Sequence, residues 1–311
     1  MVKQGWQPGF SCDVKHQDRW HGTVCAGGTV LRLELMDNGL RGTLPTELGL
    51  LPDLTTLVVE SNPSLSGTVP TEIGALARLN SLSISNNTLI SGTIPQQLTL
   101  LTSLRFLSLH SASLSGTLPA TPPTYLSKIM YLNAASNRLG GHMLPAHHMN
   151  AASFVSVHTN VLSGTIATQI GLLTSLKDRL YAQSNRLSGT LPSELGNLNQ
   201  APLPALHENS ISGLIPTELA HVTQLTFPSL SYNQLTGTTP TELKQNWISL
   251  DARLDLASNR LSDAGAQATI DANIISRGLS DSTPRLWYTP WERCDLRAET
   301  MGRFQCSSSV V

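Results

Sequence analysis

Leucine and isoleucine recur along most of the chain in a unit that repeats every 22 to 26 residues. The first half of each unit alternates apolar and polar positions and ends in asparagine, as in LTTLVVESN at 54–62 and LNSLSISNN at 79–87. This alternation predicts a short strand whose leucines enter the core while their neighbours face outward. The second half, such as LSGTLPSELGNL at 187–198, predicts a helical turn with proline in its first turn.

An asparagine column and a proline column mark the repeats. The asparagines stand at the end of each predicted strand, with one interruption at Ala112: Asn38, Asn62, Asn87, Asn137, Asn160, Asn185, Asn209, Asn233 and Asn259. The prolines open each predicted helical turn, with Ala167 in one of the positions: Pro45, Pro70, Pro95, Pro119, Pro145, Pro192, Pro216 and Pro240. An asparagine amide can hydrogen-bond to the backbone of adjacent turns, so we expect a ladder. One unit cannot bury its own leucine face, so stability must come from stacking.

The unit LxxLxLxxNxLSGxIPxxLGxL resembles the plant-type leucine-rich repeat, which is found in receptor ectodomains, secreted inhibitor proteins, and algal and protist proteins. The resemblance covers about 28–262. It implies an α/β repeat fold, a right-handed solenoid of about ten repeats with a concave parallel β-sheet and disulfide-capped ends. We therefore divide the chain into an N-terminal cap at 1–27, the solenoid at 28–262, and a C-terminal helix and cap at 263–311.

The four cysteines lie outside the repeats, two at each end. Four cysteines allow three pairings. The pairing Cys12–Cys25 with Cys294–Cys306 fits a rod with distant ends, and it indicates an oxidising compartment. Four free thiols in a cytosolic protein are the alternative. The sequence from Cys12 to Leu35 is similar to the N-terminal cap of plant-type repeats, although less chain precedes it than the family usually has.

The composition narrows the location and the partners. No apolar stretch approaches the ~20 residues that cross a bilayer, and the start of the chain lacks the apolar core of a secretory signal. We expect an extracellular or secretory-lumen protein whose signal peptide has been removed; a protein that is not secreted is the alternative. The formal net charge is −1, and no basic run is present, so nucleic acid and anionic membranes are not expected partners.

Two prolines fall where the pattern requires the first leucine of a strand. Pro204 and Pro228 each remove a donor from the expected hydrogen-bond ladder, and Ala182 weakens the same region. We expect the sheet to be irregular from about 176 to 232. An error in the sequence is the alternative explanation.

The outward positions of the predicted strands form the face where repeat proteins usually bind. Aromatic and histidine side chains gather in a few columns of this face, and we take them as candidate ligand-binding residues: Phe106, His110, Tyr131, Phe154, His158, Tyr181, His207, Phe227 and Tyr232. Rings beside hydrogen-bonding groups suit a protein, a peptide or a glycan. The alternative is that these rings only pack across strands.

Catalytic, metal and cofactor chemistry finds no support in the sequence. His110, His158 and His207 are two units apart, roughly 9–10 Å at the usual strand spacing, whereas the ligands of one zinc ion lie about 2 Å from it. His147 and His148 have no carboxylate or cysteine in a local ligand pattern. No G-x-S-x-G elbow is present. We therefore expect no enzyme activity, no metal and no cofactor.

Two further features bear on function. Asn86 begins the sequon Asn86-Asn87-Thr88, a candidate glycosylation site. Threonine follows glycine in seven units: Thr43, Thr68, Thr93, Thr117, Thr165, Thr190 and Thr238. Some plant-type repeat proteins bind ice through evenly spaced threonines, although threonine is also ordinary at this position in the family.

The expected function is thus extracellular, non-catalytic recognition of a protein, peptide or glycan on the concave face. The alternative is a structural role, as a wall or matrix protein, a subunit of a larger assembly, or an ice-binding protein.

Overall fold

The computed structural model describes residues 22–119, 123–143, 149–177, 180–198, 201, 203–222, 229–243 and 255–262. Backbone contacts divide the chain into two units, Met1–Ile270 and Asp271–Val311, and every described residue lies in the first. Cys12, Cys294, Cys306 and the predicted segment 263–311 fall outside the described residues. The disulfide pairings and the C-terminal cap therefore stay predictions.

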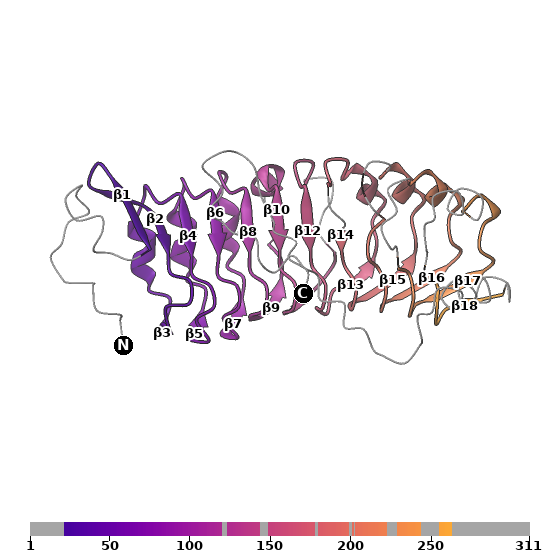
Figure 1. The fold of residues 1–311 in the computed structure, drawn as a ribbon, viewed down its shortest axis with the longest axis horizontal. Helices are drawn as coiled ribbons and strands as arrows, with labels where there is room; N and C mark the ends of the chain where they lie inside the picture. Colours follow the sequence, from indigo (N-terminus) through magenta and orange to yellow (C-terminus); the bar gives the residue numbers. More distant parts are fainter. Residues whose placement is uncertain are drawn as a thin grey trace, which may run out of the picture. The chain divides into compact units, whose positions relative to one another are not determined.

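The alternating first halves of the units form one eight-stranded sheet, which we call the long sheet (Figure 1). Its strands stand in chain order: β1 (Thr23–Ala26), β2 (Thr29–Glu34), β4 (Thr56–Val58), β6 (Ser81–Ser83), β8 (Phe106–Ser108), β10 (Tyr131–Asn133), β12 (Phe154–Ser156) and β14 (Leu180–Tyr181). All pairs are parallel except β1 with β2, which is antiparallel. The parallel sheet expected from the pattern is confirmed.

The leucine columns of the strands form a continuous core behind the long sheet. Its members in the strands and at their starts are almost without exposure: Leu54, Leu57, Leu79, Leu82, Leu104 and Leu107. The residues on either side of each central leucine face the other way, as the two-residue period of a strand requires. We call this second side of the long sheet the front face.

Two shorter sheets follow the asparagine column. The alternation of apolar and polar residues does not predict them. One contains β3 (Arg41–Thr43), β5 (Ser64–Thr68), β7 (Leu89–Thr93), β9 (Ser113–Thr117) and β11 (Arg138–Gly140). The other contains β13 (Ser163–Thr165), β15 (Arg186–Thr190), β16 (Ser210–Gly213), β17 (Gln234–Gly237) and β18 (Arg260–Leu261). Most threonines of the LSGT segments therefore end paired strands.

Short 3₁₀ helices complete the coils: η2 (Thr46–Leu50), η3 (Thr71–Ala75), η4 (Gln96–Leu100), η5 (Pro123–Lys128), η7 (Thr168–Leu172), η8 (Ser193–Asn197) and η9 (Thr217–His221). Before η2, η3, η4, η8 and η9, proline precedes the helix instead of lying in its first turn. Pro45, for example, is extended at φ −76° and ψ 144°, and its carbonyl accepts the N–H of Leu48 at 3.3 Å. The fixed φ of proline suits this entry.

The asparagine column holds the bend after each strand of the long sheet. The Asn87 side chain is fully buried. Its Oδ1 accepts the backbone N–H of Asn62 at 2.9 Å, and its Nδ2 donates to the carbonyls of Val59 at 2.6 Å and Ile84 at 2.7 Å. The residue before each column position is left-handed, with φ between 49° and 58° at ten non-glycine positions. The asparagine thus satisfies backbone groups that this bend takes out of the sheet.

The expected irregular region is confirmed in the described residues. The long sheet ends at β14, which is two residues long, and beyond it only isolated bridges join Tyr181 to Ala205 and Ser229 to Asp255. Pro204 lies directly before the first of these bridges, where it has no N–H to donate. Pro228 lies outside the described residues.

Candidate recognition surface

Four aromatic rings stack along the front face of the long sheet. Phe106, Tyr131 and Phe154 begin β8, β10 and β12 and are partners in register. Their centroids are 4.3 Å apart between Phe106 and Tyr131, and 4.5 Å between Tyr131 and Phe154, with planes within 5° and 8° of parallel. Tyr181 on β14 adds a tilted ring 5.9 Å from Phe154. We call these four side chains the aromatic stack.

The geometry of the aromatic stack follows from the strand spacing. Parallel strands lie about 4.8 Å apart, so a ring at the same register position of three successive strands meets its neighbour almost face to face. Phe106 and Phe154 are only 6% and 7% exposed, whereas Tyr131 and Tyr181 are half-buried. The phenylalanines therefore mainly pack against the tyrosines, in line with the cross-strand alternative, and the tyrosines offer the surface.

The remaining aromatic candidates do not join this stack. Tyr232 is 60% exposed and left-handed, with φ 52°, at the bend before Asn233. Phe227 lies outside the described residues. The described stack is thus confined to β8–β14.

The histidine candidates line the same face beyond the ends of the strands. Burial, followed by the charge of His158, lowers the pKa of His110 to about 4. Burial, followed by the charge of His207, lowers the pKa of His158. Their Nδ1 atoms lie 3.2 Å from the Ser111 hydroxyl and 2.9 Å from the Thr159 hydroxyl, respectively. His110 is therefore neutral near pH 7, and its ring can accept or donate one hydrogen bond.

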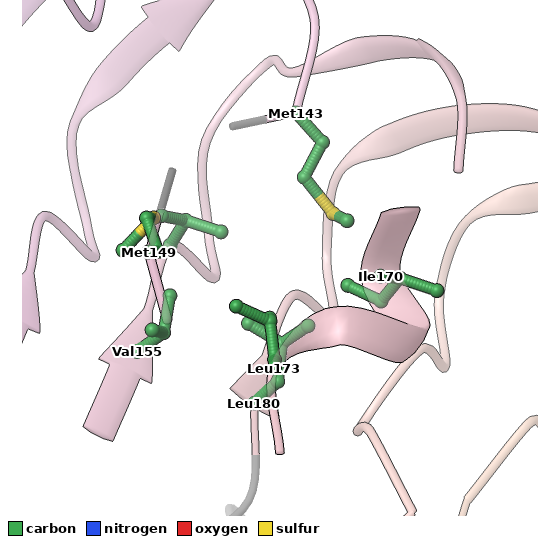
Figure 2. Close-up of a pocket in the computed structure, with 7 residues that line it drawn as sticks. Met143, Met149, Val155, Ile170, Leu173 and Leu180 are labelled. Carbon is green, nitrogen blue, oxygen red and sulfur yellow. The ribbon is translucent and has the colours of Figure 1, made fainter. Parts of the chain in front are cut away.

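The described residues hold no group of three or more histidine, cysteine, aspartate or glutamate side chains that could bind a metal ion. Figure 2 shows a pocket whose lining comes from core side chains: Met143, Met149, Val155, Val157, Ile170, Leu173 and Leu180. Every one of them is apolar, so the pocket has no side-chain group that could orient or activate a polar substrate. It is a packing gap between the long sheet and η7.

A row of hydroxyl groups beside the aromatic stack was not among the candidates from the sequence. Ser83, Ser85 and Ser108 are buried and hydrogen-bonded to one another, and Ser83 donates to the carboxylate of Glu60. Burial raises the pKa of Glu60, while the Ser83 hydrogen bond opposes this. Serine is so frequent in the chain that residue type alone does not mark this row; only the pairing of adjacent strands does.

The sequon lies at one edge of the front face. Asn86 is half-buried and left-handed, with φ 58°, and its N–H donates to the His110 carbonyl at 3.0 Å. Asn87 beside it belongs to the asparagine ladder, and Thr88 is exposed. Glycosylation at Asn86 stays a prediction.

Across the described ranges, the helices are all too short or too polar to span a membrane.

Comparison with known proteins extends this picture. The sequence profile of the Leucine Rich Repeat family matches residues 178–198. A comparison with the sequences of curated proteins finds no match.

Several solved structures are similar. The ectodomain of the Arabidopsis thaliana receptor kinase GASSHO1/SCHENGEN3, in complex with CASPARIAN STRIP INTEGRITY FACTOR 2, is 30% identical with a TM-score of 0.70, over 80% of this chain and 33% of that chain. The plant peptide hormone receptor RGFR1 in complex with RGF2 is 29% identical with a TM-score of 0.58, over 71% and 39%. A plant ice-binding protein shares the fold at 23% identity and a TM-score of 0.53, over 85% and 93%.

The chain spans about a third of the first receptor and well under half of the second. The coil geometry, the asparagine ladder, the family profile and these structures agree on one class. Residues 178–198 carry a leucine-rich repeat, and the solenoid is similar to those of plant leucine-rich-repeat receptor ectodomains, which is consistent with a leucine-rich-repeat protein of the plant type.

Proposed function

We propose that the protein is a non-catalytic, extracellular recognition module that binds a protein or peptide segment, or a glycan, on the front face of the long sheet. The observation that carries the proposal is the aromatic stack, which is fixed in place by the strand spacing beneath it. Rigid rings lose little conformational freedom on binding, which is why they are frequent at the centre of interfaces.

The surroundings of the stack suit a partner with polar groups. The half-buried tyrosines Tyr131 and Tyr181 each have an apolar ring and a hydroxyl group. Next to them stand the amide of Asn133 on β10 and the imidazole of His158 beyond β12. Such a surface can cover apolar groups of a partner while hydrogen-bonding to its backbone or hydroxyls. The similarity to the peptide hormone receptor RGFR1 supports this class of partner.

A display selection tests the proposal. Peptides from a random library are selected on the folded chain and then measured on the Tyr131→Leu variant, which keeps an apolar side chain but removes the ring. Loss of a central aromatic contact predicts about 10- to 100-fold weaker binding. Thr190→Ser, at the end of β15 in a short sheet, is the matched control and should bind as the wild type does. Selected peptides that bind Tyr131→Leu as well as the wild type would refute the proposal.

The threonine column supports a second candidate, binding to ice or another ordered surface. The seven threonines are exposed, and most end strands of the short sheets. The methyl group of Thr43 lies against Gly67 of the next coil, so close that a Cβ on Gly67 would be only 2.8 Å from it. Thr68 lies against Gly92 in the same way, and a Cβ on Gly92 would be 2.9 Å from its methyl group. Six of the seven threonines pack against a glycine of the next coil in this way, whereas His142 and Leu214 occupy the corresponding positions of two coils and interrupt the row.

Ice-recrystallisation inhibition by the folded chain tests this candidate. The double variant Thr93→Tyr/Thr117→Tyr, which places bulky groups in the middle of the row, should abolish any inhibition. The Tyr131→Leu variant should retain it. If the wild type does not inhibit recrystallisation, the row serves the scaffold only.

A further inference from the structure

Four polar side chains form a hydrogen-bonded chain beside the aromatic stack: Glu60, Ser83, Ser85 and Ser108. We call it the serine–glutamate chain. The Ser83 hydroxyl donates to Oε1 of Glu60, the Ser83 and Ser85 oxygens are 3.4 Å apart, and the Ser85 and Ser108 oxygens are 2.7 Å apart. The three serines are at most 3% exposed, and Glu60 is half-buried. The chain crosses from β4 through β6 to β8.

The carboxylate fixes the direction of every hydroxyl in this chain. An ionised carboxylate only accepts, and each serine has one proton to donate. Because Ser83 gives its proton to Glu60, its contact with Ser85 requires Ser85 to donate. The contact of Ser85 with Ser108 then requires Ser108 to donate. All three protons point toward Glu60, so the positions left open on the chain are lone pairs, which can only accept.

No basic side chain of the described residues neutralises Glu60. Burial raises the pKa of the Glu60 carboxyl, the Ser83 hydrogen bond opposes this, and no described lysine, arginine or histidine forms an ion pair with it. Arg32, on the adjacent strand β2, pairs with Glu34 at 3.0 Å instead. A half-buried carboxylate without a cation is unfavourable in a folded protein, and such groups mark functional sites more often than other positions do.

A fourth serine gives an independent sign of a missing partner. Ser81 begins β6 two residues before Ser83, so both face the same side of the sheet. The Ser81 Oγ is buried, with the residue 1% exposed, and no hydrogen-bond partner for it exists among the described residues. Buried hydroxyls are normally hydrogen-bonded. In register, Ser81 pairs with Phe106, the first ring of the aromatic stack.

We propose that the serine–glutamate chain binds the ammonium or guanidinium group of a basic side chain on the protein or peptide partner, which rests on the recognition function proposed above. A cation with several N–H donors matches the half-buried carboxylate of Glu60, the one member of the serine–glutamate chain that is not buried. The aliphatic part of lysine or arginine would lie along the edge of the stack at Phe106, as such stems do on apolar surfaces. The partner is therefore basic at the position that meets β4–β8.

The test uses the folded chain and peptides selected from a random library. Peptides that bind the Tyr131→Leu variant more weakly than the wild type are taken as binding at the aromatic stack. Lysine and arginine should be enriched in these peptides. Glu60→Gln keeps an oxygen that accepts from Ser83 but removes the charge. This variant should bind these peptides about 10- to 100-fold more weakly, which is the effect of losing a charge-assisted hydrogen bond. Glu47→Gln, an exposed glutamate on η2, is the matched control and should change nothing.

A change in the peptide gives the same test without altering the protein. Replacing the peptide's lysine by norleucine should weaken binding to the wild type as much as Glu60→Gln does, and should have no further effect on Glu60→Gln. Stack-dependent peptides without basic residues, or indifferent to both changes, would overturn this inference and leave the recognition function standing. If no selected peptide depends on Tyr131, both are wrong.

Discussion

Asn87→Ala is the sharpest test of how the coils are joined. The Asn87 amide is fully buried and spans two coils: it accepts the N–H of Asn62 and donates to the carbonyls of Val59 and Ile84. Alanine cannot replace any of these bonds, and the fully buried site offers no access to water. Three backbone groups would therefore lose their partner at once.

The magnitude follows from the number of groups left unsatisfied. Each buried polar group without a partner costs about 1–3 kcal/mol. Relaxation of the coil recovers part of this, so we expect the variant to lose about 3–5 kcal/mol of unfolding free energy, which is at the high end for a single substitution. Because Asn87 joins adjacent coils, the loss should appear in the main cooperative transition and not as fraying of one end.

Urea unfolding followed by far-ultraviolet circular dichroism measures this loss. Asn80→Ala is the matched control: Asn80 is half-buried one residue before β6, and its hydrogen bonds in the described residues come from its backbone, whose N–H donates to Thr55 and whose carbonyl accepts from Arg105 and Phe106. It should lose less than about 1 kcal/mol. If Asn87→Ala is no more destabilising than Asn80→Ala, the asparagine column does not hold the coils together.

Three further predictions address other parts of the fold. Gly189 has φ 75°, and a Cβ there would lie 2.7 Å from the Thr165 methyl, so Gly189→Ala should lose about 1–3 kcal/mol; a loss within experimental error would contradict this. Burial, followed by the charge of His158, lowers the pKa of His110 to about 4, below the value of about 6.5 in the unfolded chain. As the pH falls, the unfolded chain therefore binds a proton at His110 before the folded chain does. The unfolding free energy should be highest above about pH 6.5 and should fall by about 3 kcal/mol toward pH 4. Urea titrations at both pH values should show a smaller difference for His110→Gln, and an unchanged one for His110→Gln would rule this cause out. Thr159 is a β-branched residue with φ 53°, a backbone conformation that asparagine tolerates better. Thr159→Asn should therefore raise the unfolding free energy by about 0.5–1 kcal/mol. A melting temperature below that of the wild type would show that Thr159 does not strain the bend.

The regular half of each coil could be predicted from the sequence because its rules are local. Alternation placed Leu57 and Leu82 in the core, and the position of Asn62 after the strand placed its amide at the bend. Pro204 predicted the end of the regular sheet, because a proline lacks the backbone N–H that a strand donates to its neighbour, whatever surrounds it. These features depend on the period of one coil alone.

The rest depends on how neighbouring coils meet. The short sheets form from LSGT segments, which have no simple alternation and hold a glycine at a positive φ. Tyr181 occupies a different column from Phe154, yet tilts against it. The direction of the hydroxyls in the serine–glutamate chain is set by one carboxylate two strands away from Ser108. No period in the sequence encodes such contacts.

Photo-crosslinking tests the central claim, that the front face of the long sheet is the binding surface, most directly. A selected peptide carrying a photoreactive residue is bound to the folded chain, irradiated, and its attachment points are mapped by mass spectrometry. The account predicts attachment to residues on the front face of β6–β14, around Tyr131 and Tyr181. Attachment confined to the 3₁₀ helices or to the threonine column would contradict it.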